Sequence, residues 1–306
     1  MEMDFVGFGP LRLEYIYEIK DPLYVKDLGI EEGEEVLWKG REEWLLRDRL
    51  LVFGRHKATL PDGGLGTTLV AVSGKGHKVG LVGLIGRDKE GEELLGHFKS
   101  FDVTRVLRKG RTDVSYVVLR EGHRPIRVYV QRDLQRLKKE QLDLAYFQGA
   151  KWVHFVPFMD SEGAGIQLEA KGFLQGRVKV SFDLCCPFLP FHQVLAGIEG
   201  AEVVTVKGRA LKGLGISWDQ VAQGVRVLLV VSEAGLSLYQ NGKEKLGLEG
   251  EEYEGGYDFL VGAFLSLYYG TGDLLYAFEG AVKGALFAHE ERKKGNPPPL
   301  DALKEG

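Results

Sequence analysis

The sequence contains few cysteines, and the two that are present are neighbours. Cys185 and Cys186 lack the spacing of an ordinary disulfide or of paired metal ligands, so we expect both to be small buried side chains. Asparagine is also scarce, occurring only as Asn241 and Asn296, whereas Glu, Lys and Arg are abundant. This bias is known from heat-adapted proteins and indicates a thermophile.

Long apolar runs and long runs of one charge are missing as well. The longest uncharged apolar stretch, residues 259–269, is too short to span a bilayer and indicates a buried helix. Acidic and basic residues are mixed along the chain, with a formal net charge of -4, which argues against nucleic acid or a membrane as partner. The first residues show no secretory signal pattern, so we expect a cytoplasmic protein.

Three familiar site motifs are absent. No G-x-x-x-x-G-K-[ST] phosphate loop occurs, and Gly7-Phe8-Gly9 precedes an alternating strand instead of the helix that a dinucleotide site requires. The histidines form no H-E-x-x-H or similar cluster, so a zinc hydrolase has no support. A nucleotide site in this chain must therefore use a motif other than these.

The residues that are present indicate an ordinary soluble globule, with 44% hydrophobic and 27% charged residues among 306. Short β-branched or apolar runs alternate with amphipathic stretches of helical length, and Thr271-Gly272-Asp273 supplies the cap of a final helix. This alternation predicts an α/β fold, a doubly wound and mostly parallel sheet covered by helices on both faces. The expected buried strands are residues 78–85, 152–156, 178–182, 203–206 and 226–231.

Four further segments alternate between apolar and polar residues, as strands with one exposed face do: 13–19, 35–38, 114–119 and 124–130. They suit a small sheet attached to the main body, and one use of such a sheet is a lid over an active site. The expected domains are therefore a main domain of residues 1–12, 55–110 and 131–306, with an inserted lid of residues 13–54 and 111–130.

One loop carries the chemistry most clearly. In Gly255-Gly256-Tyr257-Asp258, paired glycines precede an acid at the start of an apolar helix. Backbone N–H groups there would stabilise charge on a transferred phosphoryl group, and the carboxylate would accept the proton of an attacking hydroxyl. From this motif alone, a flexible loop closed by an Asp cap remains the simpler alternative.

The order of several motifs resembles the ribokinase (PfkB) family over nearly the whole chain, with some adenosine-kinase-like features. The first strand leads to an acid, a glycine-rich run is followed by G-x-D-x-x-G, and an acid opens an apolar helix near the C-terminus. The segments that carry the resemblance are Val6–Glu14, Gly63–Thr68, Gly86–Gly91, Gly122-His123-Arg124, Asp183 and Asp258–Phe264. In the family the aspartate at position 88 is mainly structural.

This resemblance implies a ribokinase-like three-layer α/β/α fold and an enzyme that uses ATP and Mg2+ to phosphorylate a hydroxymethyl group of a sugar or nucleoside. It also implies a homodimer formed through the lid sheet. The implied roles are catalysis by Asp258 as base with Gly255, Gly256 and Tyr257 as anion hole, substrate binding by Arg12, Glu14, Gly63, Gly64, Thr68 and Asp183, and nucleotide binding by Lys207, Ser232 and Gly235. No residue is assigned as a metal ligand.

The sequence departs from the family pattern at the residues that bind phosphate, substrate and magnesium in the family. The family's G-A-G-D reads G-G-Y-D, so the side chain of Tyr257 falls at the anion hole, and the usual Asn of the first signature is Thr68. The N-x-x-E motif that helps to hold magnesium falls at Lys207 to Ala210 and has neither key residue. An alternative hypothesis follows: a catalytically impaired ribokinase-like protein that binds a sugar, nucleoside or nucleotide as a sensor or partner protein.

Overall fold

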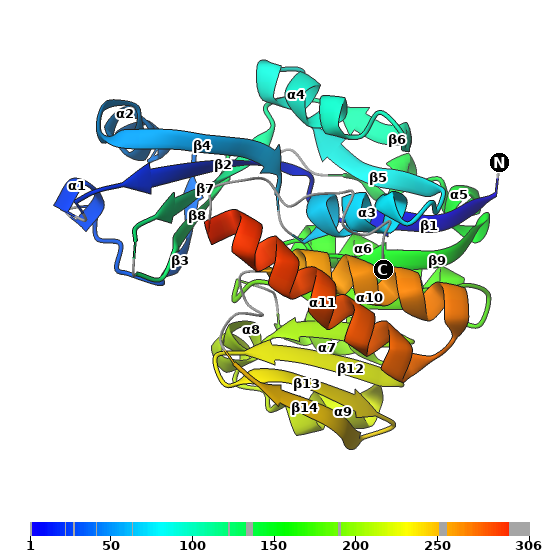
Figure 1. The fold of residues 1–306 in the computed structure, drawn as a ribbon. Coiled ribbons are helices and arrows are strands. Elements are labelled where there is room, and N and C mark those ends of the chain that lie inside the picture. The colour runs from blue at the N-terminus through cyan, green and yellow to red at the C-terminus, as the bar shows by residue number, and fades with distance from the viewer. Residues whose placement is uncertain are drawn as a thin grey trace.

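The computed structural model describes residues 2–21, 23–26, 28–40, 42–62, 64–121, 123–132, 137–188, 191–250 and 256–293. Within these residues the chain forms a nine-stranded sheet sandwiched between helices and a five-stranded sheet that projects to one side (Figure 1). Two adjacent sheets in one chain match the expected pairing of a main body with a lid.

The nine-stranded sheet has the order β14-β13-β12-β11-β10-β9-β1-β5-β6. Neighbouring strands from β12 to β6 are parallel, and β13 and β14 add an antiparallel hairpin at one edge. The central strands are apolar and buried along their length because helices cover both faces. The strands are β1 (Met3–Phe8), β5 (Val79–Ile85), β6 (Asp102–Arg108), β9 (Ala150–Phe155), β10 (Lys179–Leu184), β11 (Val203–Lys207), β12 (Val227–Ser232), β13 (Gly235–Gln240) and β14 (Lys243–Glu249).

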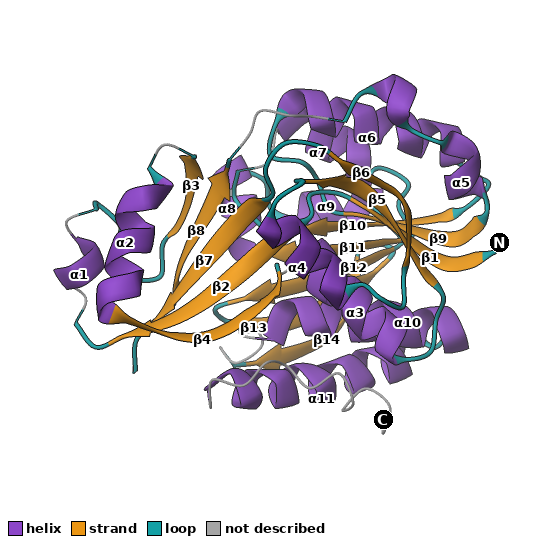
Figure 2. Ribbon diagram, turned by 90° about the horizontal axis from the view of Figure 1, so that it is seen from above, coloured by secondary structure: helices purple, strands orange, loops and turns teal. Residues whose placement is uncertain are grey.

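The helices lie in two layers (Figure 2). One face of the sheet carries α3 (Leu65–Gly74), α10 (Tyr257–Thr271) and α11 (Leu274–Lys293), and the opposite face carries α5 (Leu144–Gln148), α6 (Ser161–Leu174) and α7 (Phe191–Ile198). The predicted three-layer α/β/α architecture with a mostly parallel sheet is confirmed. The remaining helices of the main body are α4 (Lys89–His97), the 3-10 turn η1 (Lys139–Gln141), α8 (Gly208–Leu214) and α9 (Trp218–Gly224).

The five-stranded sheet has the order β3-β8-β7-β2-β4. It contains all four alternating segments found in the sequence, together with one strand that the sequence analysis assigned to the main domain. That strand, β4, follows α2 and pairs with β2 at the edge of the sheet. An edge strand has a neighbouring strand on one side only, so its sequence need not alternate between apolar and polar residues. The elements of this lid are β2 (Arg12–Ile19), α1 (Leu23–Lys26), β3 (Glu35–Lys39), α2 (Glu43–Phe53), β4 (Gly54–Pro61), β7 (Asp113–Leu119) and β8 (Ile126–Gln131).

Short-range signals set the boundaries of the elements near the C-terminus. Asp273 caps α11, because its Oδ1 accepts hydrogen bonds of 3.0 Å from the N–H groups of Leu275 and Tyr276. Gly272, with φ 69°, ends α10 in the left-handed conformation that favours glycine. The predicted cap of the final helix is confirmed, whereas its predicted stop at Gly295 lies outside the described residues.

The lid covers the carboxyl ends of the parallel strands. β1 ends at Phe8 and β2 begins the lid at Arg12, so this edge of the sheet faces the lid (Figure 2). Arg124 Nη1 of the lid lies 2.7 Å from Glu233 Oε1, and Arg209 Nη1 donates a 2.7 Å hydrogen bond to the carbonyl of Gly33. A ligand beyond the strand ends would therefore be enclosed between the two sheets. Among the described residues, no helix is long and apolar enough to cross a membrane.

Candidate active site

Asp258 lies in the first turn of α10 and is only 2% exposed. Its Oδ1 accepts a 2.6 Å hydrogen bond from the backbone N–H of Gly64, and its carbonyl oxygen accepts one of 3.1 Å from Thr68 Oγ1. The fold thus brings together two predicted substrate residues and the predicted base. The N-cap residue of α10, Gly256, has no side chain to cap the helix, so within the described residues the helix begins with N–H groups that suit an anion.

Gly256, the N-cap of α10, is required by the packing of two helices. A Cβ at this position would lie 2.3 Å from the carbonyl oxygen of Ala285 in α11. The glycine pair in the sequence is therefore explained in part by the close approach of α11 to the start of α10. Its first member, Gly255, lies outside the described residues, as does Gly63 of the earlier pair.

Tyr257 turns its side chain toward the sheet, where it is 1% exposed. Its hydroxyl donates a hydrogen bond to Oδ1 of Asp183 at the end of β10, and Thr205 Oγ1 donates a 2.9 Å hydrogen bond to the same oxygen. The other carboxylate oxygen of Asp183 is buried and has no hydrogen-bond partner among the described residues. Burial raises the pKa of Asp183 to about 7 against these two hydrogen bonds, and the charge of nearby Asp258 acts in the same direction.

Lys207 ends β11 beside these groups and is 8% exposed. Its ammonium lies 4.9 Å from the centroid of the Tyr257 ring, a cation–π distance. Burial disfavours the charge, but the carboxylates of Asp258 and Glu35 more than offset this, so the pKa of Lys207 lies above its ordinary value. No hydrogen bond or ion pair joins the ammonium to another described residue. Lys207 is thus a nearly buried cation whose three N–H donors have no hydrogen-bond partner among the described residues.

The lid contributes a second cluster of charges. Glu14 is 1% exposed, and its Oε2 lies 2.7 Å from Nη1 of Arg127 on β8. Asp62, directly after β4, binds Nε of Arg12 through one oxygen and lies 3.4 Å from Nη1 of Arg127 through the other. Both guanidinium groups also lie over the ring of Tyr129. Each of these charges has an oppositely charged partner, which offsets the free-energy cost of burying it.

Two of these residues escaped the sequence analysis. Asp62 had a signal, because it is an acid at a strand end immediately before the pair Gly63-Gly64. Arg127 had only its position in an alternating strand, which does not distinguish an inward-facing arginine from a solvated one. Arg12 and Glu14 lie in one cluster, their partners come from elements remote in the sequence, and their binding of substrate stays a prediction.

The two cysteines lie next to the site as buried free thiols, as the sequence indicated. A Cβ built on Gly64 would lie 3.3 Å from Sγ of Cys185. Gly64 also has φ 83°, a conformation that side chains rarely adopt. A glycine at this position is therefore needed both for its backbone conformation and for the close approach of β10.

The predicted nucleotide residues of β12 lie beside the end of β11. A Cβ on Gly208, which follows Lys207, would be 3.0 Å from Cβ of Ser232. Ser232 Oγ also accepts a 3.3 Å hydrogen bond from the N–H of Ala234. Gly235 has φ 144° and opens β13, where a Cβ would meet the carbonyl oxygen of Leu248. Of these two residues, only Ser232 has a side chain available at the strand end.

The acidic groups of the site do not fit a protein-bound magnesium ion. Such an ion needs one or two carboxylates that face open space for water and phosphate oxygens. Asp183 is fully enclosed behind Tyr257, and Asp258 uses Oδ1 to bind Gly64. Within the described ranges, no group of three His, Cys, Asp or Glu side chains could hold a metal ion. The described residues therefore offer no set of protein ligands for the magnesium expected from the resemblance.

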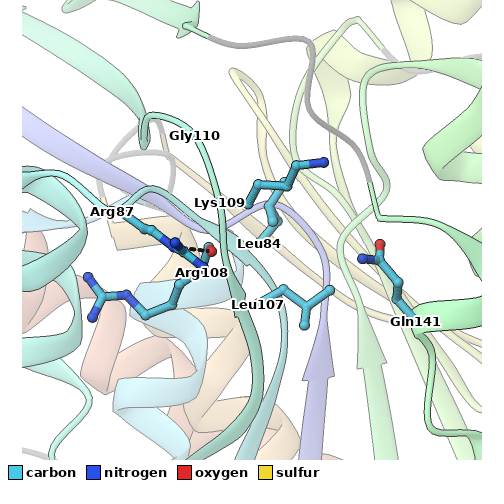
Figure 3. Close-up of a pocket in the computed structure, with 7 residues that line it drawn as sticks. All are labelled: Leu84, Arg87, Leu107, Arg108, Lys109, Gly110 and Gln141. Carbon is cyan, nitrogen blue, oxygen red and sulfur yellow. Dashed lines mark hydrogen bonds between the residues drawn. The ribbon is translucent and has the colours of Figure 1, made fainter.

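A pocket of about 460 Å³ lies elsewhere, at the carboxyl ends of β5 and β6 (Figure 3). Leu84 and Leu107 line it, with Lys109 and Gln141 on either side. None of the residues expected from the sequence to form the site belongs to its lining. Lys109, which lines this pocket, therefore serves as a control lysine outside the predicted site.

Comparison with known proteins identifies the fold. No protein-family model and no curated protein matches the chain. Among solved structures, it resembles adenosine kinase from Sinorhizobium meliloti with a TM-score of 0.78 and 16% identity, covering 99% of this chain and 98% of that one. It resembles ribokinase from Arabidopsis thaliana, solved with ribose and ATP, with a TM-score of 0.65 and 16% identity over 100% of both chains. A probable sugar kinase from Rhizobium etli has a TM-score of 0.79 and 17% identity, covering 100% and 98%.

These similarities extend over whole chains, although the identities are low. The chain therefore has the ribokinase-like fold of PfkB carbohydrate and nucleoside kinases, as the order of its motifs indicated.

Proposed function

We propose that this chain is an ATP-dependent phosphotransferase that phosphorylates a hydroxymethyl group of a sugar or nucleoside. One observation carries the proposal: the Lys207 ammonium, which has no ion-pair partner among the described residues, lies close to the Asp258 carboxylate. The N-terminus of α10, whose N-cap Gly256 has no side chain, begins beside it. A base next to donors for an anion is the combination that phosphoryl transfer needs. The kinases among the similar structures support it, since one was solved with ribose and ATP.

In this proposal Asp258 accepts the proton of the acceptor hydroxyl as its oxygen attacks the γ-phosphorus. The new P–O bond forms while the bond between the γ-phosphorus and the bridging oxygen breaks, and ADP leaves with that oxygen's charge. The N–H groups of Gly255, Gly256 and Tyr257 and the ammonium of Lys207 stabilise the charge that develops. The Gly64 N–H keeps the Asp258 carboxylate in place.

The acceptor lies between Asp258 and the lid cluster. Arg12, Glu14, Asp62 and Arg127 alternate donors and acceptors there, which suits the adjacent hydroxyls of a sugar or ribose ring. Gly63, Gly64 and Thr68 complete the proposed substrate side, whereas Asp183 lies behind Tyr257 and acts by accepting the hydrogen bond of its hydroxyl. Ser232 and Gly235 lie on the proposed nucleotide side, next to Lys207.

A screen of sugars and nucleosides for ATP consumption tests the proposal, with Asp258→Asn as the key variant. The amide keeps an oxygen to accept from Gly64 but is a poor base, so turnover should fall about 100- to 10,000-fold with little loss of stability. Asp273→Asn is the matched control, because Asn replaces Asp well as a helix cap. Turnover that is indifferent to Asp258→Asn contradicts the assignment.

The absence of a magnesium ligand set among the described residues favours one alternative, a chain that binds these ligands without transferring phosphate. Thermal-shift measurements separate the two: stabilisation by a sugar or nucleoside but not by ATP supports the alternative. Turnover of any acceptor eliminates it. The homodimer through the lid sheet also stays a proposal, and light scattering of the purified protein checks it.

A further inference from the structure

The position of Lys207 coincides with the loss of the residues that hold magnesium in the resembled family. Lys207 stands at the first position of the N-x-x-E motif and Ala210 at the last. The structure replaces the missing ligands with a positive charge of its own, since Lys207 is only 8% exposed and its ammonium has no ion-pair partner within the described residues. Its three N–H donors suit the oxygens of a bound anion.

Tyr257 holds that ammonium in place. Its ring lies under the cation at 4.9 Å, and the ring itself is fixed from behind by the hydrogen bond of its hydroxyl to Asp183. Thr205 donates to the same Asp183 oxygen. A glycine at position 257, as in the family pattern, would leave Lys207 without this platform. The substitutions at positions 207 and 257 are thus explained together, as one assembly.

We infer that Lys207, positioned by the ring of Tyr257, takes the place of a protein-bound metal ion, so that this chain binds the polyphosphate of a nucleoside triphosphate in metal-free form. The inference rests on the proposed function, because it concerns the same donor site. The side chain of Tyr257 acts here as a positioning group and makes no contact with the reacting atoms.

Charge explains why the metal-free form is preferred. A metal-free triphosphate brings its full negative charge to Lys207 and to the N-terminus of α10, where charge-assisted hydrogen bonds are strongest. Magnesium on the phosphates would cancel part of that charge and place a second cation near the ammonium. Magnesium should therefore weaken binding to this chain, whereas it strengthens binding to a site built from carboxylates.

Titration calorimetry tests the inference with tripolyphosphate and ATP, each in EDTA and in excess MgCl2. The expected result is that both probes bind more tightly in EDTA. Lys207→Met should weaken metal-free binding by about 10- to 100-fold, the worth of a hydrogen bond to a charged group, and Lys207→Arg should restore part of it. Lys109→Met, at the pocket remote from Asp258, is the matched control and should change nothing.

Two variants of Tyr257 separate positioning from simple structural support. Tyr257→Phe keeps the ring under the ammonium and should retain the preference for metal-free ligand. Tyr257→Leu removes the ring and should reduce that preference, even when its melting temperature equals that of Tyr257→Phe. Equal effects of Phe and Leu on the ratio of the two dissociation constants overturn the positioning role.

The outcomes distinguish this inference from the proposed function. Binding only in the presence of magnesium, or unchanged metal-free binding by Lys207→Met, overturns the inference and leaves phosphoryl transfer standing. Metal-free binding that depends on Lys207, without turnover of any acceptor, supports the inference and contradicts transfer. Failure of both probes to bind under either condition overturns both.

Discussion

Replacing Gly256 by alanine is a sharp test of how the start of α10 is built. The added Cβ would lie 2.3 Å from the carbonyl oxygen of Ala285 and 2.9 Å from its C and Cα atoms, all in the backbone of α11. Ordinary contacts begin at 3.4 Å, so α11 must move away by about 1 Å. The φ of Gly256 is -107°, which alanine adopts easily, so the cost comes from the contact alone.

We expect Gly256→Ala to lower the free energy of unfolding by about 1–3 kcal/mol, the usual cost of overpacking. A smaller loss comes from replacing a glycine N-cap by alanine. Urea unfolding followed by circular dichroism measures the change. The same shift displaces the N–H groups at the start of α10, so polyphosphate binding should weaken in the variant as well.

Gly270→Ala is the matched control in the same helix. No heavy atom lies within 4 Å of the Cβ it would add, and its φ is not positive. Because alanine favours a helix by up to about 1 kcal/mol over glycine, this variant should be as stable as the parent or more stable. Unfolding of Gly256→Ala and Gly270→Ala at the same urea concentration would contradict the close contact between α10 and α11 at Gly256.

Three further predictions concern the lid and the core. Arg127→Leu removes one partner of the buried Glu14 carboxylate and should cost about 3–5 kcal/mol in urea unfolding; a loss under 1 kcal/mol contradicts a buried pair. Burial lowers the pKa of His154 to about 3. Between pH 6.5 and pH 5 the imidazole is therefore protonated in the unfolded chain but not in the folded one, and the free energy of unfolding should fall by about 2 kcal/mol over this range. His154→Gln should remove that part of the loss, and an unchanged pH profile refutes it. Glu233→Gln breaks an exposed lid contact with Arg124 and should change stability by less than about 1 kcal/mol while hydrogen exchange in β7 and β8 rises; unchanged exchange contradicts a role in holding the lid.

The sequence predicted the fold well wherever a strand was buried on both faces. Such strands are continuous apolar runs, and all five of those expected lie in the large sheet. Strands at the edges were harder, since β4 and β14 carry mostly polar residues and pair on one side only. Their pairing is decided by the neighbouring strand and not by their own pattern.

The sequence named some residues of the candidate site, but it missed Asp62 and Arg127 and gave none of the contacts. The acid at position 258 and the glycine at 64 were both expected, yet their direct hydrogen bond joins segments that only the fold brings together. Tyr257 shows the limit most clearly. Its sequence position suggested a side chain at the anion hole, whereas the hydrogen bond to Asp183 directs the side chain toward the sheet. The local sequence does not show which hydrogen-bond partner a side chain finds on another strand.

The central claim is that the chain transfers the γ-phosphoryl group of ATP to a hydroxyl with Asp258 as base. Phosphorus-31 NMR of the protein with ATP and a panel of sugars and nucleosides tests it most directly. We predict a phosphomonoester resonance that grows together with ADP, and a loss of at least about 100-fold in its rate with Asp258→Asn. ADP accompanied only by inorganic phosphate, or a phosphomonoester that forms at the same rate in the variant, would contradict the account.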